Sequence, residues 1–440
     1  MRTRGAAARM LTDDPVMSKR TRPPRAHAPT SPTPAAQAQL AALGRQVQQL
    51  IGGGDFRAAL IAAHTALIMV PDNGRVLGDI ALCHMRLGAL KRAQATYLQA
   101  LRAQPDDENL VDGLAECCGR LGEIDAAVTH GRRALQLKAA QVAQQPAWPI
   151  PAARAPVFAS TASARNLLSF SLFGGHARYC ETAILNVERA RQLLPAWRCR
   201  FYLDGSVPPI IIDRLHAAGA DIVHMDLHAA RAAHPLMWRF LVLDDASVER
   251  FLLRDADSLV SAREAAAVNA WIASGAWFHL MRDFYTHTEL LLAGLWGGCG
   301  GVFRDVARSV IEYTNAPPRL GARVIDQQWL RVRAWPTVRQ SVLAHDGVFG
   351  FAGAVPFPAH TPVTDQGDDF HVGANVGQVN VGGETGLADG SLVHWCVLDA
   401  DGREICRYAS ACSGGRWSAS LPRAYADDLL TGRWRCEVVT

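Results

Sequence analysis

A repeat near the amino terminus constrains the fold of this chain more than any other feature. Gly54, Gly88 and Gly122 are separated by 34 residues each time, and alanines five residues after each glycine keep the same interval. Pro-Asp pairs at Pro71 and Pro105 stand where the first two units end. A unit of this length, with small residues at fixed places, predicts two helices joined by a glycine-containing turn.

The period of 34 residues is that of tetratricopeptide repeats. We therefore expect about three repeats over residues 36–143, stacked into an all-α array with a concave groove. Ala139 stands where a third proline would fall, which suits a terminal repeat. The groove would hold a peptide or protein partner, or the array would serve as a spacer or oligomerisation block, and both interpretations stay open.

Residues 1–35 form a basic tail whose seven basic and two acidic side chains account for the positive net charge of the chain, +4. This composition predicts disorder, and we expect no nucleic-acid partner. The chain has no apolar run of transmembrane length, and the tail lacks the apolar core of a signal peptide, so we expect a cytoplasmic protein. A proline-rich linker over 144–163 follows the repeats.

After this linker, apolar runs alternate with helical patterns. Strands are expected over 166–174, 199–204, 221–225 and 248–254, and helices over 179–194 and 207–215. Strands separated by helices of this length predict a parallel, Rossmann-like α/β sheet, which we place within residues 164–375. Ligands of such sheets bind at the carboxyl ends of the strands.

Two aspartates stand at one of these strand ends. Asp255 and Asp257 follow the expected strand over 248–254 and precede Ser261–Glu264, a capping box that begins a helix. Two carboxylates with this spacing can share Mg²⁺ or Mn²⁺, whose other ligands are phosphate oxygens. Alternatively, Asp255 and Asp257 belong to a polar turn without a metal. The same Asp-Ala-Asp sequence recurs over 399–401, where a hairpin turn is expected.

The last part of the chain has a third pattern. Residues 376–440 contain short alternating runs separated by DADG, SGG and LTG turns. This pattern predicts a small all-β domain, similar to an antiparallel sandwich. We expect Trp395, Trp417 and Trp434 to pack in its core rather than to bind a glycan.

An ordered string of motifs within about residues 164–375 resembles a family of GT-A-type glycosyltransferases. The string is SFSLFGGHARYCETAILNVERARQLLPAWRCRFYLDGSVP, MWRF, RDADS, SAREAAAV, FHLMRD, THTELLLAGLWG and DQQWL. The resemblance implies transfer of a sugar from a nucleotide-diphosphate donor to a glycan or protein acceptor, with Asp255 and Asp257 on Mn²⁺ or Mg²⁺. Three residues in two of the motifs depart from the expected pattern: Phe284-Tyr285 replaces His-Pro, and Leu295 replaces Met. These departures motivate an alternative, a repeat scaffold with an inactive transferase-like domain.

The resemblance also implies roles for other residues. Arg239 and Arg254 would contact the diphosphate, or would form salt bridges with nearby acids; both remain open. Asp283 in FHLMRD and Asp326 in IDQQWL would lie near the sugars, one of them as general base. For Asp326 the alternative is a helix N-cap. His345 in VLAHDG is a candidate third metal ligand.

Overall fold

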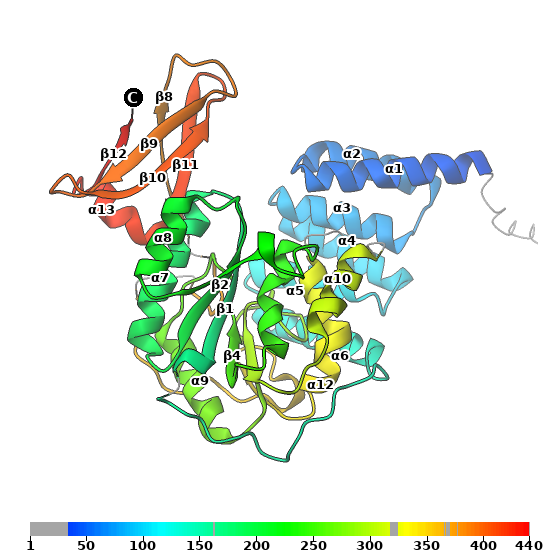
Figure 1. The fold of residues 1–440 in the computed structure, drawn as a ribbon. Helices are drawn as coiled ribbons and strands as arrows, with labels where there is room; N and C mark the ends of the chain where they lie inside the picture. Colours follow the sequence, from blue (N-terminus) through cyan, green and yellow to red (C-terminus); the bar gives the residue numbers. More distant parts are fainter. Residues whose placement is uncertain are drawn as a thin grey trace, which may run out of the picture.

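The computed structural model describes residues 34–161, 163–316, 324–364, 366, 370–375 and 377–439. It contains an all-α array, an α/β domain with a parallel-rich sheet, and two small antiparallel sheets (Figure 1). The expected disordered tail lies outside the described residues, except for its last two, which begin the first helix. No helix in the described ranges combines the length and the apolar character that a membrane span requires.

Six helices form the array. They are α1 (Pro34–Gly52), α2 (Phe56–Met69), α3 (Gly74–Arg86), α4 (Leu90–Ala103), α5 (Glu108–Arg120) and α6 (Ile124–Gln141). Gly54, Gly88 and Gly122 join the helices of each pair, with φ angles of +80°, +79° and +76° that favour glycine. The alanines five residues after each glycine are 0% exposed. The predicted helical repeats are confirmed, and they begin at Pro34.

The α/β domain is built from seven strands and the helices between them. In chain order these are β1 (Asn166–Leu172), α7 (Ala177–Leu193), β2 (Arg198–Leu203), α8 (Pro209–Ala217), β3 (Asp221–His224), the 3₁₀ segment η3 (Pro235–Asp244), β4 (Arg250–Leu253), α9 (Ala262–Ser274), β5 (Phe278–Arg282), β6 (Trp296–Cys299), α10 (Val306–Asn315), α11 (Ile325–Trp329), α12 (Trp335–Val338) and β7 (Val342–Asp346). Every residue of β1 is buried, as expected of a central strand.

The strand order of this sheet is β3-β2-β1-β4-β6-β5-β7. All neighbouring strands are parallel except β6, which is antiparallel to both β4 and β5. The expected parallel sheet is therefore correct except at this strand. Residues 283–295, between β5 and β6, contain no helix. Without a crossover helix, the chain returns antiparallel beside the strand it has just left.

The carboxyl-terminal region forms two small antiparallel sheets, β10-β9-β12 and β11-β8. Their elements are β8 (Gln378–Glu384), β9 (Leu392–Leu398), β10 (Glu404–Ala411), β11 (Arg416–Pro422), α13 (Ala426–Leu430) and β12 (Arg435–Val438). Trp395 and Trp417 stack with ring centroids 5.8 Å apart and are buried, as predicted. Residues 399–401 form the turn between β9 and β10, which confirms the expected hairpin.

A buried carboxylate attaches the small sheets to α7. Glu181 is 0% exposed and accepts hydrogen bonds from the hydroxyls of Tyr408 (2.6 Å) and Tyr425 (2.8 Å). Arg214 of α8 binds the same carboxylate with both terminal nitrogens, at 2.7 and 2.9 Å. The negative charge is thus matched by one cation and two hydroxyls, which fixes the small sheets against α7 and α8 (Figure 1).

A buried cation attaches the repeat array to the other side of the α/β domain. Lys138 of α6 is 0% exposed and lies 2.5 Å from Asp112 of α5 and 2.9 Å from Glu289 of the α/β domain. Its ammonium group also donates to the Thr288 carbonyl at 2.9 Å. Burial raises the pKa of Asp112 to about 6, and the nearby Lys138 charge opposes this rise by lowering the same pKa.

Two glycines of the array allow aromatic rings of the α/β domain to approach closely. A Cβ on Gly119 would overlap the ring of Tyr285, and a Cβ on Gly131 would overlap the ring of Phe349. Tyr285 is one of the three residues that depart from the resembled motifs. The departure therefore lies at a contact with the repeats.

Replacing Lys138 with alanine should destabilise the protein strongly. The change leaves Asp112 and Glu289 without their shared cation, and breaking a buried ion pair in this way typically costs about 3–5 kcal/mol. Urea unfolding followed by tryptophan fluorescence measures the loss. Lys91→Ala is the matched control, because Lys91 is 71% exposed and pairs with Glu123 at the surface. Equal stabilities of the two variants would contradict a structural role for Lys138.

Candidate active site

The loop after β4 carries Asp255 and Asp257 at the carboxyl end of the strand, as the sequence predicts. Here β4 lies beside β1, and the strand order reverses between them, with β2 and β3 on one side and β6, β5 and β7 on the other. Open α/β sheets bind ligands in the crevice at such a reversal. The Asp255 and Asp257 side chains are 42% and 25% exposed, so a ligand can reach both.

Arg239 links Asp255 to Asp326. Its guanidinium is 3% exposed, and it contacts Asp255 Oδ1 through Nη1 and Asp326 Oδ2 through Nη2, the latter at 2.9 Å. Two serines of β1 fix the backbone of this residue. Ser169 donates to the Arg239 carbonyl at 2.7 Å, and the Arg239 amide donates to the Ser171 hydroxyl at 3.0 Å. Arg239 was expected either to contact the diphosphate or to form a salt bridge. The salt bridge is observed, and both of its carboxylate partners belong to the candidate site.

Asp257 is contacted by two residues that sequence reasoning did not single out. Its Oδ2 lies 3.4 Å from Nη2 of Arg178 and accepts a hydrogen bond of 2.9 Å from the Asn375 amide. Arg178 lies in the first turn of α7, directly after β1. Its position after the end of a strand could have marked Arg178 as a candidate site residue from the sequence. Asn375 gave no such signal. Burial raises the pKa of Asp257, and the Asp255 charge raises it further.

Asp326 lies in the first turn of α11 and is buried. The N-cap of this helix is Val324, so the N-cap alternative for Asp326 is wrong. Its Oδ1 accepts from the Gln327 amide at 2.8 Å, while Oδ2 accepts from Arg239. Burial raises the pKa of Asp326, and the Arg239 cation opposes this rise.

Three buried polar atoms, on Arg239 and on the two residues that follow Asp326 in the chain, have no hydrogen-bond partner in the described part of the chain. They are Arg239 Nε, Gln327 Oε1 and Gln328 Nε2. Buried polar groups in folded proteins are nearly always paired, so an orphaned group points to a missing water, ion or ligand. Arg239 Nε belongs to the guanidinium that contacts Asp255 and Asp326, so this atom suits a polar ligand beside the aspartates.

Asp283 lies on the same edge of the sheet, after β5. Its Oδ2 accepts from Arg263 at 2.6 Å and from the Val372 amide at 3.0 Å, and no described residue donates to its Oδ1. The backbone amide of Asp283 donates to His287 Nδ1 at 3.0 Å. Because β5 is two strands from β4, the ends of the two strands are about 10 Å apart, from an interstrand spacing of about 4.8 Å.

Arg254 does not face the aspartates. Its guanidinium is 2% exposed, pairs with Glu264 and donates to the Leu253 carbonyl at 2.6 Å. The Glu264 amide donates to the Ser261 hydroxyl at 3.2 Å, which is the expected N-cap bond of α9. The salt-bridge interpretation of Arg254 is therefore observed, and its Nη2 is buried without a hydrogen-bond partner among the described residues.

His345 does not join the aspartate pair, which corrects its interpretation as a third metal ligand. It is 1% exposed, and its Nδ1 lies 3.0 Å from Nε2 of His279 on β5. His279 in turn stacks on Trp271 of α9 at 5.7 Å. The two imidazoles are thus packed between strands and α9, and burial lowers the pKa of His345 to about 4.

The aspartate pair nevertheless fits a hard divalent cation. Asp255 Oδ2 accepts no hydrogen bond from the described residues, and the mutual repulsion that raises the pKa of Asp257 would be relieved by a cation. Magnesium is commonly held by one or two carboxylates with substrate phosphates and waters as its other ligands. Among the residues that the structure describes, no group of three or more His, Cys, Asp or Glu side chains is placed to hold a metal.

Comparison with known proteins identifies the repeats. The tetratricopeptide repeat model matches residues 50–117, from the end of α1 into α5. Together with the helix pairs described above, this match shows that the chain contains tetratricopeptide repeats, which are typical of protein-binding scaffolds. No curated protein matches the chain.

Three solved structures each resemble about a quarter of the chain. The TPR2AB domain of yeast Sti1 in its pHSP90 complex is 16% identical with a TM-score of 0.23, over 24% of this chain and 43% of that one. PcrH with the chaperone binding region of PopD is 22% identical with a TM-score of 0.24, over 26% of this chain and 85% of that one. SycD of Yersinia enterocolitica is 17% identical with a TM-score of 0.24, over 26% and 83%. None of these likenesses supports an argument about function.

Replacing Gly294 with alanine should disturb the Asp255 loop. A Cβ at this position would overlap the Asp255 carboxylate and would lie 2.8 Å from its backbone nitrogen. We expect a loss of about 1–3 kcal/mol in the free energy of unfolding, the usual range for overpacking. Urea unfolding measures this loss. Gly386→Ala is the control, because nothing lies within 4 Å of a Cβ there. If Gly294→Ala matches this control, the close approach is not present in solution.

Proposed function

We propose that the α/β domain transfers a glycosyl group from a nucleotide-diphosphate sugar to an acceptor hydroxyl. The observation that carries this proposal is the convergence of Asp255, Asp257 and Asp326, with Arg239 and Arg178, beside the reversal of strand order. Open α/β sheets bind nucleotides at this place, and arginines pair well with phosphate. The resemblance to GT-A-type glycosyltransferases points to the same reaction.

Asp255 and Asp257 would hold Mn²⁺ or Mg²⁺, which when bound neutralises charge on the diphosphate. The two arginines act beside them. Arg239 keeps one unpaired buried nitrogen, Nε, and Arg178 likewise keeps Nε unpaired within the described residues. Each guanidinium can therefore donate to a phosphate oxygen while it retains its carboxylate contact.

The proposed transfer breaks one bond, forms another and moves one proton. The bond between the anomeric carbon and the diphosphate oxygen breaks, and the diphosphate leaves with the electron pair. The acceptor oxygen bonds to the anomeric carbon and gives its proton to a base. We assign Asp283 as this base, because no described residue donates to its Oδ1, whereas both Asp326 oxygens accept hydrogen bonds.

The repeats support a second role for the same chain, the binding of a protein partner or of a protein acceptor. Helices α5 and α6 contact the α/β domain, so we assign partner binding to the part of the array formed by α1–α4. The alternative of a scaffold with an inactive transferase-like domain has less support, because the acidic residues and arginines of the candidate site converge.

One nucleoside diphosphate should stabilise the protein in the presence of Mn²⁺. A ligand at 100 times its Kd adds about 2.7 kcal/mol, which raises the melting temperature by several degrees. The measurement is thermal shift with UDP, GDP, CDP or TDP, each with Mn²⁺ and with EDTA. Asp257→Ala should abolish the shift. Asp401→Ala should not, since Asp401 has the same Asp-Ala-Asp spelling in an exposed hairpin turn. Absence of a shift with all four nucleotides would overturn the proposal.

The two remaining acids should respond differently to amide substitution. Asp283→Asn should lower the release of nucleoside diphosphate in the presence of acceptor by roughly 10²–10⁴-fold, the usual contribution of a general base, with the nucleotide-dependent shift retained. Asp326→Asn should weaken the shift itself, because it removes a carboxylate that holds Arg239. Full turnover in Asp283→Asn would show that another group accepts the proton.

A further inference from the structure

Arg263 joins the two acidic loops of the candidate site. It lies in the first turn of α9, after the loop that carries the aspartate pair, and its Nη1 donates to Asp283 Oδ2 at 2.6 Å. The start of this helix is fixed by the N-cap bond from the Glu264 amide to the Ser261 hydroxyl. Arg263 therefore connects the loop after β4 to the end of β5, on the edge of the sheet where both lie.

The two described donors to the Asp283 carboxylate reach the same oxygen. Oδ2 accepts from Arg263 and from the Val372 amide, the latter at 3.0 Å, and the side chain is 8% exposed. Two directional hydrogen bonds on one oxygen oppose rotation of the carboxylate about its Cβ–Cγ bond. A Cβ on Gly347 would lie 3.0 Å from the other oxygen, Oδ1, so the glycine leaves space beside it. The two bonds therefore keep Oδ1 turned toward this space.

The Arg263 guanidinium is itself held in one orientation. Its Nε donates to His360 Nε2 at 3.1 Å. Its Cζ lies over the rings of Phe357 and Phe370, 5.9 and 5.2 Å from their centroids. His360 Nδ1 lies 2.9 Å from the Pro358 carbonyl oxygen, which can only accept, so Nδ1 carries the proton and Nε2 accepts from Arg263. A neutral His360 thus fixes the plane of the guanidinium.

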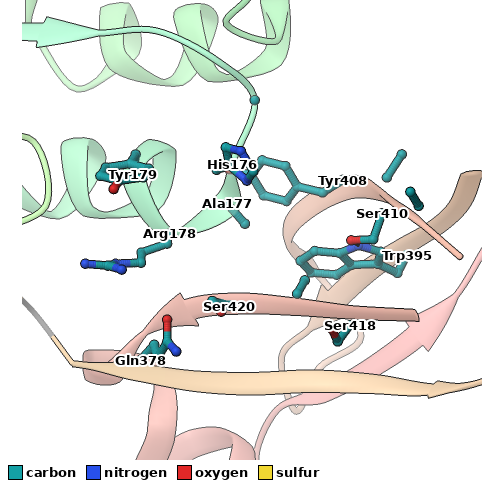
Figure 2. A pocket seen from close by; sticks show the side chains of 14 residues that line it. His176, Ala177, Arg178, Tyr179, Gln378, Trp395, Tyr408, Ser410, Ser418 and Ser420 are labelled. Carbon is teal, nitrogen blue, oxygen red and sulfur yellow. The ribbon is translucent and has the colours of Figure 1, made fainter. Parts of the chain in front are cut away.

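Arg263 differs from the two arginines that we assign to the diphosphate. Arg178 at the start of α7 (Figure 2) contacts Asp257 and keeps its Nε unpaired among the described residues. Arg239 likewise keeps its Nε unpaired. Arg263 instead uses both Nε and Nη1 on side chains of the protein. A lysine would supply the same charge but not two donors in a fixed plane, so these contacts indicate orientation as well as charge compensation.

We propose that Arg263, held by His360, is a positioning residue for the proton-accepting carboxylate of Asp283; this inference rests on the glycosyl-transfer function proposed above. Arg263 neither takes the proton nor contacts the donor. It holds Oδ2, so that Oδ1 receives the proton of the acceptor hydroxyl while the acceptor oxygen bonds to the anomeric carbon. A misplacement of about 1 Å in such a group can cost about 10²-fold in rate. Loss of Arg263 should therefore lower kcat and leave the KM for the donor unchanged.

The test measures release of nucleoside diphosphate from UDP-, GDP-, CDP- and TDP-linked hexoses and N-acetylhexosamines, with Mn²⁺ present and water as the acceptor. A base that accepts the proton of an acceptor hydroxyl also accepts that of water. Arg263→Ala should lower kcat by about 10²-fold with the donor KM unchanged. Guanidinium chloride, added well below denaturing concentrations, should restore part of this kcat, because the Arg263 side chain is 28% exposed and a small cation can take its place.

Arg198→Ala is the matched control, since Arg198 pairs with Asp221 at 3.0 Å and its side chain is 43% exposed. This variant should keep the wild-type kcat and gain nothing from guanidinium. Arg263→Lys keeps the charge but cannot hold Asp283 and His360 in one plane, so its kcat should also fall, and it serves if the alanine variant does not fold. His360→Gln retains an acceptor for Arg263 and should keep more of the rate than His360→Ala.

The nucleotide-dependent thermal shift separates this inference from the function on which it rests. If wild type shows neither a nucleotide shift nor release of nucleoside diphosphate, the donor function fails and the inference fails with it. If wild type shows both and the Arg263 variants keep its kcat, the ion pair with Asp283 is structural only, and this inference alone is wrong. Loss of the nucleotide shift in Arg263→Ala would also overturn it, because Arg263 would then serve donor binding.

Discussion

The candidate site depends on how one buried guanidinium is shared. Arg239 pairs with Asp255 from the loop after β4 and with Asp326 from α11, and its backbone is bonded to Ser169 and Ser171 of β1. Three segments that are distant in the sequence are therefore tied to a single side chain. Removing a partner from such a buried network leaves uncompensated charge, which is expensive, so the arrangement constrains the carboxylates around it.

The two outer domains are held by the same kind of interaction. Lys138 fixes the repeat array, and Glu181 fixes the small sheets, each as a fully buried charge with partners on both sides of the boundary. Close packing of Tyr285 on Gly119 gives a physical reason for the Phe284-Tyr285 departure, since this loop meets the repeat array. The loop that carries Asp283 is thus supported by the repeats.

Much of the architecture was predictable because it follows from local pattern. The spacing of Gly54, Gly88 and Gly122 specified helix pairs, since a left-handed turn needs glycine and the helices need small residues where they cross. Alternating apolar runs specified the α/β sheet and placed Asp255 and Asp257 at a strand end. The antiparallel β6 was not predicted, because no local signal states on which side of a neighbour a returning strand will pair.

The sequence by itself determined the order of domains, the repeats and the acidic pair, all of which depend on residues near one another in the chain. Only the tertiary structure decided which side chains meet that pair. Arg178 and Asn375 reach Asp257 across 79 and 118 residues, while His345 pairs with His279 away from it. Such contacts depend on strand order and on the face to which each side chain points, and spacing along the chain encodes neither.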